Sequence, residues 1–422
     1  MSRNKVLTII LSLLVVVPMV LASCAPAEQD VVTVEVKETV VVVATPTPAP
    51  AEAEAEEEAE AEPEAAPLPD VIKIGVNETM TGWGAPYGDM TWKGIQVAHE
   101  HKPEVLGTPV ELILVDNKSE KSESALAAQR LIDVEKVQAV IGVNSSSMAM
   151  AQNEVLDPAG IPAIGPACTN PLVTLDKPHA FRAAFIDPFQ GEAAARFAVE
   201  ELEAKTCALL VDITLDYCVG LGNYFRENFI ELTGDNHSIL GYFSFQTGDR
   251  DFTAQLTAIK ELNPDIVFAP NEYAEEAAIL QQAQQLGLTP DIKFMAGDSC
   301  DVPELVEIAG EAANGFSYTA QFHPDGYTHP EAVKFIDGFR EAYDLEPETF
   351  SVTGYDAYMI LMDAIERAGS VDPEAITQAL AVTEFVGARG LVTFDEEGNA
   401  LAPCPVIGIE DGQKVFRYLV EP

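Results

Sequence analysis

From Val71 onward, short apolar runs rich in β-branched residues alternate with segments whose apolar residues recur at helical spacing. The short runs predict buried strands and the periodic segments predict amphipathic helices, with Gly, Pro or Asn at their ends. The expected strands are 71–76, 110–115, 139–143, 161–165, 207–212, 239–245, 266–269 and 293–296. The expected helices include 91–100, 122–135, 189–202, 251–261 and 275–286. This alternation is typical of right-handed βαβ units on a parallel sheet.

The alternation comes in two consecutive sets, the second opening near Arg196. The stretch from Val71 to Pro422 is too long for one compact core, so we expect an α/β fold of two doubly wound parallel-sheet lobes. The C-terminal tail, from residue 351 onward, departs from this alternation of strands and helices. Helices are expected at 351–368 and 373–381, and a hairpin is expected at 390–399. We expect the tail to return to each lobe, which gives crossover strands, a hinge and a cleft. The expected division is 71–187 plus 321–385 for lobe I and 188–320 plus 386–422 for lobe II.

The first 24 residues have the pattern of an export signal. Arg3 and Lys5 precede an apolar run, 6–21, which ends in Leu-Ala-Ser-Cys. A run this short that ends in small residues is more typical of a cleaved peptide than of a membrane span. The Leu-Ala-Ser-Cys end resembles the lipobox of bacterial lipoproteins, which implies a lipid on Cys24; the alternative is an ordinary secretory peptide with an unrelated cysteine. Both interpretations place the protein outside the cytoplasm.

Residues 25–70 combine a Thr-Pro repeat with an Ala/Glu tract and show no apolar periodicity that a core could bury. We interpret them as an acidic, proline-rich, disordered tether, because like charges and prolines favour an extended backbone. One β-prone apolar stretch inside it, 31–43, has no assigned role. The whole chain carries a formal net charge of −44 at pH 7. This charge argues against nucleic acid and against an anionic bilayer surface as partners, so membrane contact is expected only through the N-terminal lipid.

The cysteines and histidines give no sign of a metal site or an active site. The cysteines other than Cys24 are Cys168, Cys207, Cys218, Cys300 and Cys404, an odd number that leaves at least one thiol free or bonded to another molecule. None lies in a Cys-x-x-Cys or histidine-containing array, and no histidine lies near a nucleophile elbow. We therefore expect neither a metal, nor a cofactor, nor catalysis.

Three turns that follow expected strands could hold a ligand. Residues 144–147 (Asn-Ser-Ser-Ser) precede an expected helix, and their hydroxyl and backbone N–H groups suit a carboxylate, although helix capping alone would explain one of them. Residues 166–171 end at the same sheet edge; Thr169 could bind there, or the segment could be only a turn. The glycine-rich loop 78–89 lacks a phosphate-binding spacing, and its Trp83 and Tyr87 suit an apolar wall.

Together these segments resemble the periplasmic leucine/isoleucine/valine-binding protein family, the type I solute receptors of ABC importers. The resemblance rests on the order and spacing of several segments across nearly all of 71–422: Lys73-Ile74-Gly75-Val76, Thr81-Gly82 with Tyr87-Gly88-Asp89, Ile141-Gly142 with Ser145-Ser146-Ser147, Ile161-Pro162 with residues 167–171, Tyr217, and the hairpin 390–399.

The resemblance implies the position of the ligand. Ser145, Thr169 and the backbone of Ala167 would hold an α-carboxylate and part of an α-ammonium, and Tyr87 would line the first lobe. From the second lobe, Tyr217 would close over the ligand, and Asp298 would receive the ammonium. The alternative role for Asp298 is a helix cap before 302–308.

Two departures from the family concern the cleft. Cys218 replaces the first glycine of the usual Tyr-Gly-x-Gly, and the loop after 266–269 reads Pro-Asn-Glu-Tyr where the family carries small or aromatic residues. Asn271 could reach the ligand there, and Glu272 could answer a basic group. This arrangement also puts two cysteines at the mouth of one lobe, so Cys218–Cys300 is the first disulfide to test.

The resulting expectation is a non-enzymatic, lipid-anchored extracytoplasmic receptor that closes on a small, branched-chain-like amino acid and delivers it to ABC permease subunits. The alternative is a sensing module for amides or other small carboxylates that feeds a separate signalling partner. The sequence leaves the ligand itself open.

Overall fold

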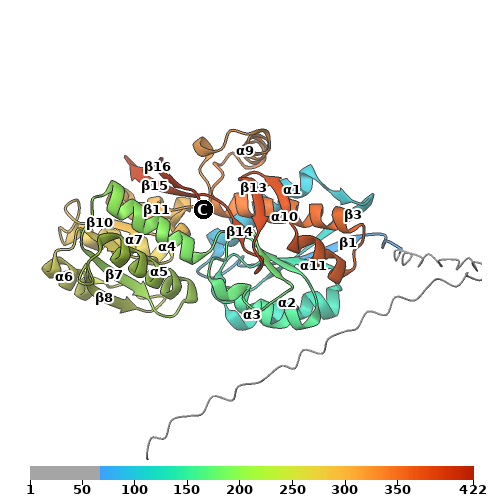
Figure 1. The fold of residues 1–422 in the computed structure, drawn as a ribbon, viewed down its shortest axis with the longest axis horizontal. Coiled ribbons are helices and arrows are strands. Elements are labelled where there is room, and N and C mark those ends of the chain that lie inside the picture. Colours follow the sequence, from blue (N-terminus) through green and yellow to red (C-terminus); the bar gives the residue numbers. More distant parts are fainter. Residues whose placement is uncertain (1–66) are drawn as a thin grey trace, which may run out of the picture. The chain divides into compact units, whose positions relative to one another are not determined.

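The computed structural model describes residues 67–422. The export signal, Cys24, the stretch 31–43 and the tether as far as residue 66 lie outside these described residues. None of the helices in 67–422 is long and apolar enough to cross a bilayer. Figure 1 shows the arrangement of the elements, coloured along the chain.

The first sheet has six strands in the order β2-β3-β1-β4-β5-β6. Its strands are β1 (Ile72–Glu78), β2 (Glu104–Val105), β3 (Thr108–Asp116), β4 (Ala139–Ile141), β5 (Ala163–Gly165) and β6 (Ala180–Arg182). All neighbours from β3 to β6 pair in parallel, and β2 pairs antiparallel at the edge. Because helices cover both faces of a parallel sheet, its inner strands are buried almost throughout, as in β1.

The second sheet has seven strands in the order β16-β15-β11-β10-β9-β7-β8. Its strands are β7 (Cys207–Asp212), β8 (Ile239–Phe245), β9 (Ile266–Phe268), β10 (Lys293–Ala296), β11 (Ser317–Thr319), β15 (Cys404–Glu410) and β16 (Gln413–Val420). The strands from β11 to β8 are parallel, and β15 and β16 add an antiparallel edge. In Figure 1 this sheet lies at the left and the first sheet at the right. The predicted fold of two mostly parallel α/β lobes is therefore confirmed.

A third, antiparallel sheet contains β12 (Glu384–Gly387), β13 (Gly390–Phe394) and β14 (Ala400–Leu401). The hairpin predicted at 390–399 corresponds to β13 and the turn that leads to β14, which begins at residue 400. Val392 and Ala400 are buried in the core that covers the first sheet. We therefore propose that the chain returns to the second lobe between β14 and β15, after residue 401 rather than near residue 386.

Helices cover both large sheets. They are α1 (Ala85–His101), α2 (Lys121–Arg130), α3 (Ser146–Leu156), α4 (Asp187–Arg196), α5 (Asp216–Thr233), α6 (Thr253–Leu262), α7 (Tyr273–Gln285), α8 (Pro303–Ala309), α9 (Pro330–Tyr343), α10 (Thr349–Ala368) and α11 (Pro373–Ala381). The predicted helices at 91–100, 122–135 and 189–202 are present, although α1 begins six residues earlier than expected and π-helical turns complete the other two. Tyr87 therefore lies in a helix and not in the glycine-rich loop, because Pro86 fits the first turn of a helix.

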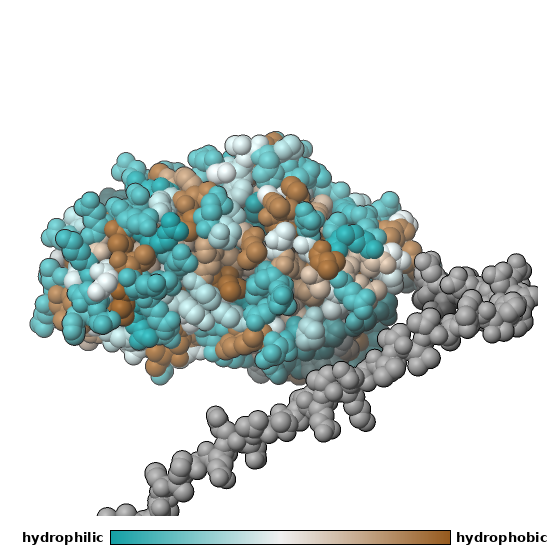
Figure 2. All heavy atoms as spheres, in the orientation of Figure 1, coloured by the Kyte–Doolittle hydropathy of each residue, from teal (hydrophilic) through white to brown (hydrophobic). Residues whose placement is uncertain are grey.

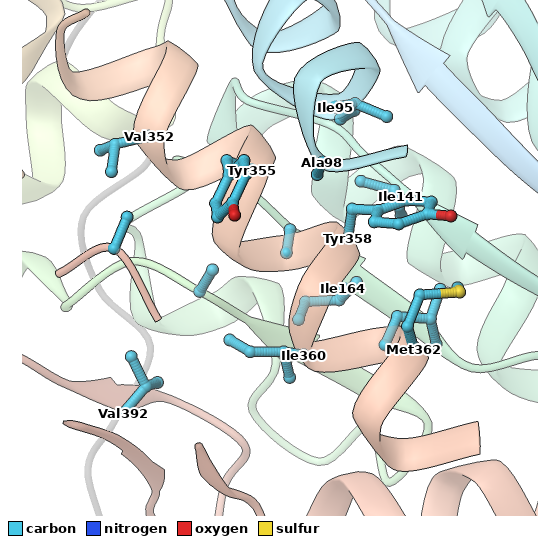
Figure 3. Close-up of a cluster of buried hydrophobic side chains, with 14 of the residues drawn as sticks. Ile95, Ala98, Ile141, Ile164, Val352, Tyr355, Tyr358, Ile360, Met362 and Val392 are labelled. Carbon is cyan, nitrogen blue, oxygen red and sulfur yellow. The ribbon is translucent and has the colours of Figure 1, made fainter. Parts of the chain in front are cut away.

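The core of the first lobe forms around α10, which is buried along most of its length. Figure 3 shows Tyr355 and Tyr358 of α10 beside Ile95 and Ala98 of α1, with Ile141 and Ile164 of the sheet nearby. Gly94 permits this close packing, because a Cβ atom there would lie 1.9 Å from the carbonyl oxygen of Ser351. On the face shown in Figure 2, hydrophobic residues are scattered among hydrophilic ones.

The second lobe has two buried clusters, one on each side of its sheet. Cys218 packs in the cluster that contains Phe225 and Phe268, whereas Cys300 packs in the cluster with Phe294 and Leu305. All the cysteines in residues 67–422 are free and buried. The Cys218–Cys300 disulfide prediction is therefore wrong, and the reason is that these thiols belong to different apolar clusters.

Along the chain, the strands change from one sheet to another after β6, after β11 and after β14. The buried Arg389 guanidinium connects two of these crossings: it donates to the carbonyl oxygen of Ala183 and to Oε1 of Gln321. It also pairs with Asp356 of α10 at 2.9 Å, and neither side chain of this pair is exposed. Arg389 thus joins the segments that follow β6 and β11 to the core of the first lobe.

Candidate ligand-binding site

A cavity lies between the two lobes, at the carboxyl ends of strands from both parallel sheets. Its volume is about 310 Å³ when the space open to solvent is included. Its lining residues are Tyr87, Asn144, Ser145, Ser146, Ala167, Tyr217, Glu272, Asp298, Ser299 and Phe350. The carboxyl edge of a parallel sheet is where ligands bind in open α/β folds.

The three serines after β4 have different roles. The Ser146 hydroxyl accepts hydrogen bonds from the backbone N–H groups of Thr169 and Asn170, at 3.2 and 3.1 Å. The Ser147 hydroxyl bonds across the cleft to Asp216, at the start of α5. Ser145 precedes the first turn of α3, its side chain makes no capping bond, and it lines the cavity. Ser145 is therefore the serine whose hydroxyl is available to a ligand.

Asn144 adds a second polar group on this wall. Its side chain is buried, and neither its amide nitrogen nor its amide oxygen has a hydrogen-bond partner. Behind it lies Glu78, whose carboxyl is close to the backbone N–H groups of Thr79 and Asn144. Burial raises the pKa of Glu78 to about 8, although these two N–H groups act in the opposite direction. Buried amides normally have partners, so the unpaired Asn144 marks a place for ligand atoms.

Ala167 and Thr169 lie in the next loop along the edge. Ala167 lines the cavity. Thr169 does not: its side chain is buried with an unpartnered hydroxyl, and its backbone N–H and carbonyl bond to Ser146 and Asp187. Both residues lie at the same edge of the sheet as the serines. Ala167 faces the cavity, and Thr169 is buried behind it.

Aromatic rings form the apolar wall. Tyr87 contacts Phe350 of α10 with ring centroids 4.6 Å apart, and it meets Tyr273 of the other lobe edge-on at 5.5 Å. The Tyr87 hydroxyl accepts a hydrogen bond of 3.1 Å from the backbone N–H of Tyr273. Trp83 lies beside Tyr87 and packs against buried clusters of both lobes, but it does not line the cavity.

Asp298 faces this wall from the second lobe. Its Oδ1 accepts hydrogen bonds from Gln190 at 2.9 Å and Tyr217 at 3.0 Å, and its Oδ2 accepts one from Gln321 at 2.9 Å. Burial raises the pKa of Asp298, while these three donors favour the carboxylate. Gly297 is required for the approach of Tyr217, because a Cβ atom there would lie 2.0 Å from the tyrosine oxygen. A carboxylate has about four acceptor positions, so Asp298 retains capacity for one more donor.

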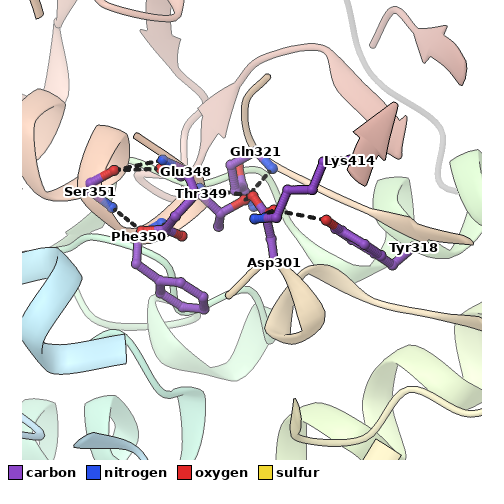
Figure 4. A network of polar contacts seen from close by, with 8 residues as sticks. All are labelled: Asp301, Tyr318, Gln321, Glu348, Thr349, Phe350, Ser351 and Lys414. Atoms are coloured by element: carbon purple, nitrogen blue, oxygen red, sulfur yellow. Dashed lines mark hydrogen bonds and ion pairs between the residues drawn. The ribbon is translucent and has the colours of Figure 1, made fainter. Parts of the chain in front are cut away.

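The turn that carries Asp298 is tied to the first lobe through Asp301. Figure 4 shows that Asp301 accepts hydrogen bonds from Thr349, from the Tyr318 hydroxyl and from Lys414. The Thr349 hydroxyl and backbone N–H bond to Oδ2 of Asp301 at 2.7 and 2.9 Å. Because Thr349 begins α10 and is followed by Phe350, this network fixes the aromatic wall relative to Asp298.

Asn271 and Glu272 follow β9, next to Asp298 after β10. The Asn271 side chain bonds to the backbone of β7, at Asp212 and Leu210, and does not line the cavity. Glu272 does line it, and burial raises its pKa to about 8. The lining contains no Lys, Arg, His or Cys side chain, and no group of possible metal ligands occurs in the part of the chain that the structure describes.

Sequence reasoning therefore anticipated Tyr87, Ser145, Ala167, Tyr217 and Asp298 at the cavity, and it assigned no role to Asn144, Ser299 or Phe350. The sequence contains a pattern that could have identified Asn144, because this residue opens the polar turn 144–147. It contains no such pattern for Phe350, since only the return of α10 to the first lobe brings this residue to the site.

Most of the chain is similar to known proteins. Residues 71–413 match the model of a family described as "Periplasmic binding protein". The "Leucine-, isoleucine-, valine-, threonine-, and alanine-binding protein" of Pseudomonas aeruginosa is 28% identical over 336 residues, which are 78% of this chain and 87% of that protein.

Two solved structures have the same fold. The leucine-binding protein LivK from Thermotoga maritima superimposes with a TM-score of 0.80 at 44% identity, covering 83% of this chain and 99% of LivK. The branched-chain amino acid transporter substrate-binding protein LivJ from Streptococcus pneumoniae, solved with isoleucine, gives 0.77 at 29% identity, covering 83% of this chain and 100% of LivJ.

Proposed function

The chain belongs to the periplasmic binding protein family, in its leucine/isoleucine/valine-binding branch, and from this membership we propose that it is the receptor of an ABC importer for a small amino acid. Members of this family are extracytoplasmic binding proteins. Here the ligand is taken up in the cleft between the lobes and presented to the permease subunits of the importer.

The observation that carries the proposal is the division of the cavity into two complementary walls. Ser145 and the unpaired amide of Asn144 face it from the first lobe, beside the first turn of α3. Asp298 faces it from the second lobe. Hydroxyl, amide and helix N-terminal groups suit a carboxylate, and a buried carboxylate suits an ammonium. An α-amino acid has both groups on one carbon atom.

Each residue then has a definite role. The α-carboxylate binds to Ser145, Asn144 and the backbone at Ala167, and the α-ammonium binds to the remaining acceptor position of Asp298. Tyr217 holds Asp298 in place and closes over the ligand, and the Tyr87 and Phe350 rings enclose the side chain. Thr169 supports this wall from behind through Ser146, Trp83 supports Tyr87, and Asn271 positions the loop that carries Glu272.

Ligand binding is coupled to closure of the cleft. The groups that hold the two ends of the ligand belong to different lobes, so a bound amino acid stabilises the closed form relative to the open one. One relative is named for leucine, isoleucine, valine, threonine and alanine, and LivJ was solved with isoleucine. The aromatic wall of this site suits the aliphatic carbon atoms of such a side chain. The proposed function consists of ligand binding and closure of the cleft and includes no catalytic step.

Attachment to the membrane is through Cys24, as a lipid-modified N-terminus after cleavage of the export signal. The prediction is that mass spectrometry of the mature protein finds a lipid on Cys24 and that Cys24→Ser releases the protein from the membrane fraction. A Cys24→Ser protein that stays with the membrane would contradict the lipid anchor and leave the receptor function intact.

The experiment that tests the receptor function is a thermal-shift screen. Protein freed of endogenous ligand by unfolding and refolding is heated with aliphatic amino acids, amides and short carboxylates. A ligand that binds only the folded state raises the melting temperature in a concentration-dependent way. Upward shifts with aliphatic amino acids are expected, and a response confined to compounds without an α-ammonium would contradict the role of Asp298.

A further inference from the structure

Glu272 is a second carboxyl group in the cavity. It is the residue before the first turn of α7, and its side chain is 6% exposed. It follows β9, and Asp298 follows the neighbouring parallel strand β10, so both carboxyl groups lie at the same edge of the second sheet. The site thus presents two acids to the ligand from one lobe.

The two acids differ in their hydrogen bonds. Asp298 already has three donors, from Gln190, Tyr217 and Gln321. Among the hydrogen bonds formed within residues 67–422, none from a backbone N–H or a basic side chain reaches the Glu272 carboxyl. Its close polar neighbour is the Tyr87 hydroxyl, whose oxygen accepts from Tyr273 and whose hydrogen is free to point towards Glu272. Most acceptor positions of Glu272 therefore remain open to the cavity.

The charges around the cavity indicate what Glu272 is suited to bind. The lining contains two carboxyl groups and no basic side chain, and a bound amino acid adds its own carboxylate. One α-ammonium satisfies one of the two acids. A buried carboxyl without a partner is costly, whereas a donor or cation placed against it recovers that cost.

We propose that Glu272 determines specificity, and that the site prefers amino acids whose short side chain ends in a hydrogen-bond donor, an ammonium above all, over those ending in a methyl group. This inference rests on the proposed function, because it assumes that an α-amino acid is anchored by Ser145 and Asp298. The Glu272 carboxyl then receives the donor at the end of the side chain, beside the Tyr87 hydroxyl.

Three ligands of nearly equal size test the proposal. Norvaline, homoserine and α,γ-diaminobutyric acid differ only in the methyl, hydroxyl or ammonium group at the end of the side chain. Binding of each to the ligand-free protein is measured by isothermal titration calorimetry. Diaminobutyric acid is expected to bind at least about tenfold more tightly than norvaline, with homoserine between them, as for a charge-assisted hydrogen bond.

The variant E272Q keeps the size of the side chain and removes its charge. It is expected to lose the preference for diaminobutyric acid while its affinity for norvaline changes less than about threefold. The matched control is E275Q, because Glu275 is also buried on α7 but bonds to Gly248 and lies outside the cavity lining. E275Q should retain the wild-type order of affinities.

The outcomes separate the two proposals. If norvaline binds the wild-type protein as tightly as diaminobutyric acid, or if E272Q keeps the preference, the role of Glu272 is overturned and the amino-acid receptor stands. If neither these three ligands nor leucine binds, the proposed function fails, and the inference about Glu272 fails with it.

Discussion

Ser147 and Asp216 bond to each other reciprocally across the cleft. The Ser147 hydroxyl donates to Oδ2 of Asp216 at 2.9 Å and accepts from the Asp216 backbone N–H at 3.1 Å. Ser147 lies in the first turn of α3 in the first lobe, and Asp216 begins α5 in the second. Lys121 also reaches the Asp216 carboxylate, at 2.8 Å, from the first lobe. Because these bonds join the lobes beside the ligand cavity, they belong to the closed form of the cleft.

Ser147→Ala should therefore weaken ligand binding without weakening the lobes themselves. The closed form loses both bonds to Asp216, so we expect the dissociation constant for the bound amino acid to rise by about 3- to 10-fold. Isothermal titration calorimetry checks the affinity. The melting temperature of the ligand-free protein should change little.

The control for this substitution is Ser122→Ala, because Ser122 is exposed on nearby α2. It should leave both the affinity and the melting temperature unchanged. An affinity of Ser147→Ala equal to that of the wild-type protein would show that the Ser147–Asp216 contact does not contribute to closure.

Arg389→Met should strongly destabilise the protein. The substitution leaves the Asp356 carboxylate buried without its cation and removes the bonds to Ala183 and Gln321. Removing one partner of a buried ion pair costs about 3–5 kcal/mol of unfolding free energy. Urea unfolding measures it.

Arg130→Met serves as the comparison for Arg389. The Arg130–Glu135 pair is formed at the surface, with the arginine side chain 58% exposed. Surface pairs contribute about 0–1 kcal/mol, so this variant should unfold almost as the wild-type protein does. Similar losses in the two variants would contradict the structural role of Arg389.

The buried carboxyl groups make stability depend on pH. Burial raises the pKa of Glu78 from 4.5 to about 8, and those of Asp187 and Glu272 also to about 8. The pKa of each group is low in the unfolded chain and about 8 in the folded protein. Between these two values the folded protein binds more protons than the unfolded chain. The free energy of unfolding therefore falls as pH rises and levels off above about pH 8. Each such group contributes up to about 1.4 kcal/mol per pH unit.

Glu78→Gln should reduce this slope by the contribution of one group. Urea unfolding at a series of pH values between about 5 and 8 measures the slope. Glu154→Gln, at an exposed position, should leave it unchanged. A Glu78→Gln protein with the wild-type slope would show that Glu78 titrates in the folded state as it does in the unfolded chain.

Much of the architecture could be predicted because the two large sheets are parallel. The inner strands β7 and β10 are buried and stand out as apolar runs, and the edge strand β8 is apolar in sequence although it is only partly buried; all three were predicted to the residue. The shortest strands were less visible: β6, at an edge, and β11, inside the second sheet, have three residues each, and the place of β11 depends on β15, far away in the chain. The position of α10 against α1 rests on Gly94, whose close contact with Ser351 has no local pattern.

At the site, the turn at 144–147 could be predicted because a polar run after a buried strand marks the edge of a sheet. The choice of Ser145 among the three serines came only from the resemblance to the family. Local sequence does not determine it, since it depends on Ser146 binding the 169–170 backbone and Ser147 binding Asp216. Asn271 and Glu272 show the same limit. The bonds from Asn271 to β7 turn its side chain away from the cavity and leave Glu272 facing it.

The most direct test of the central claim compares leucine with isocaproate, which has the same side chain and carboxylate but no α-ammonium. Titration calorimetry on ligand-free protein should show leucine binding at least about tenfold more tightly, as for a lost charge-assisted bond. Asp298→Asn should abolish this difference, while Asp133→Asn, at an exposed position, should preserve it. Equal affinity of the wild-type protein for the two compounds, or tighter binding of isocaproate, would contradict an amino-acid receptor that recognises the ammonium through Asp298.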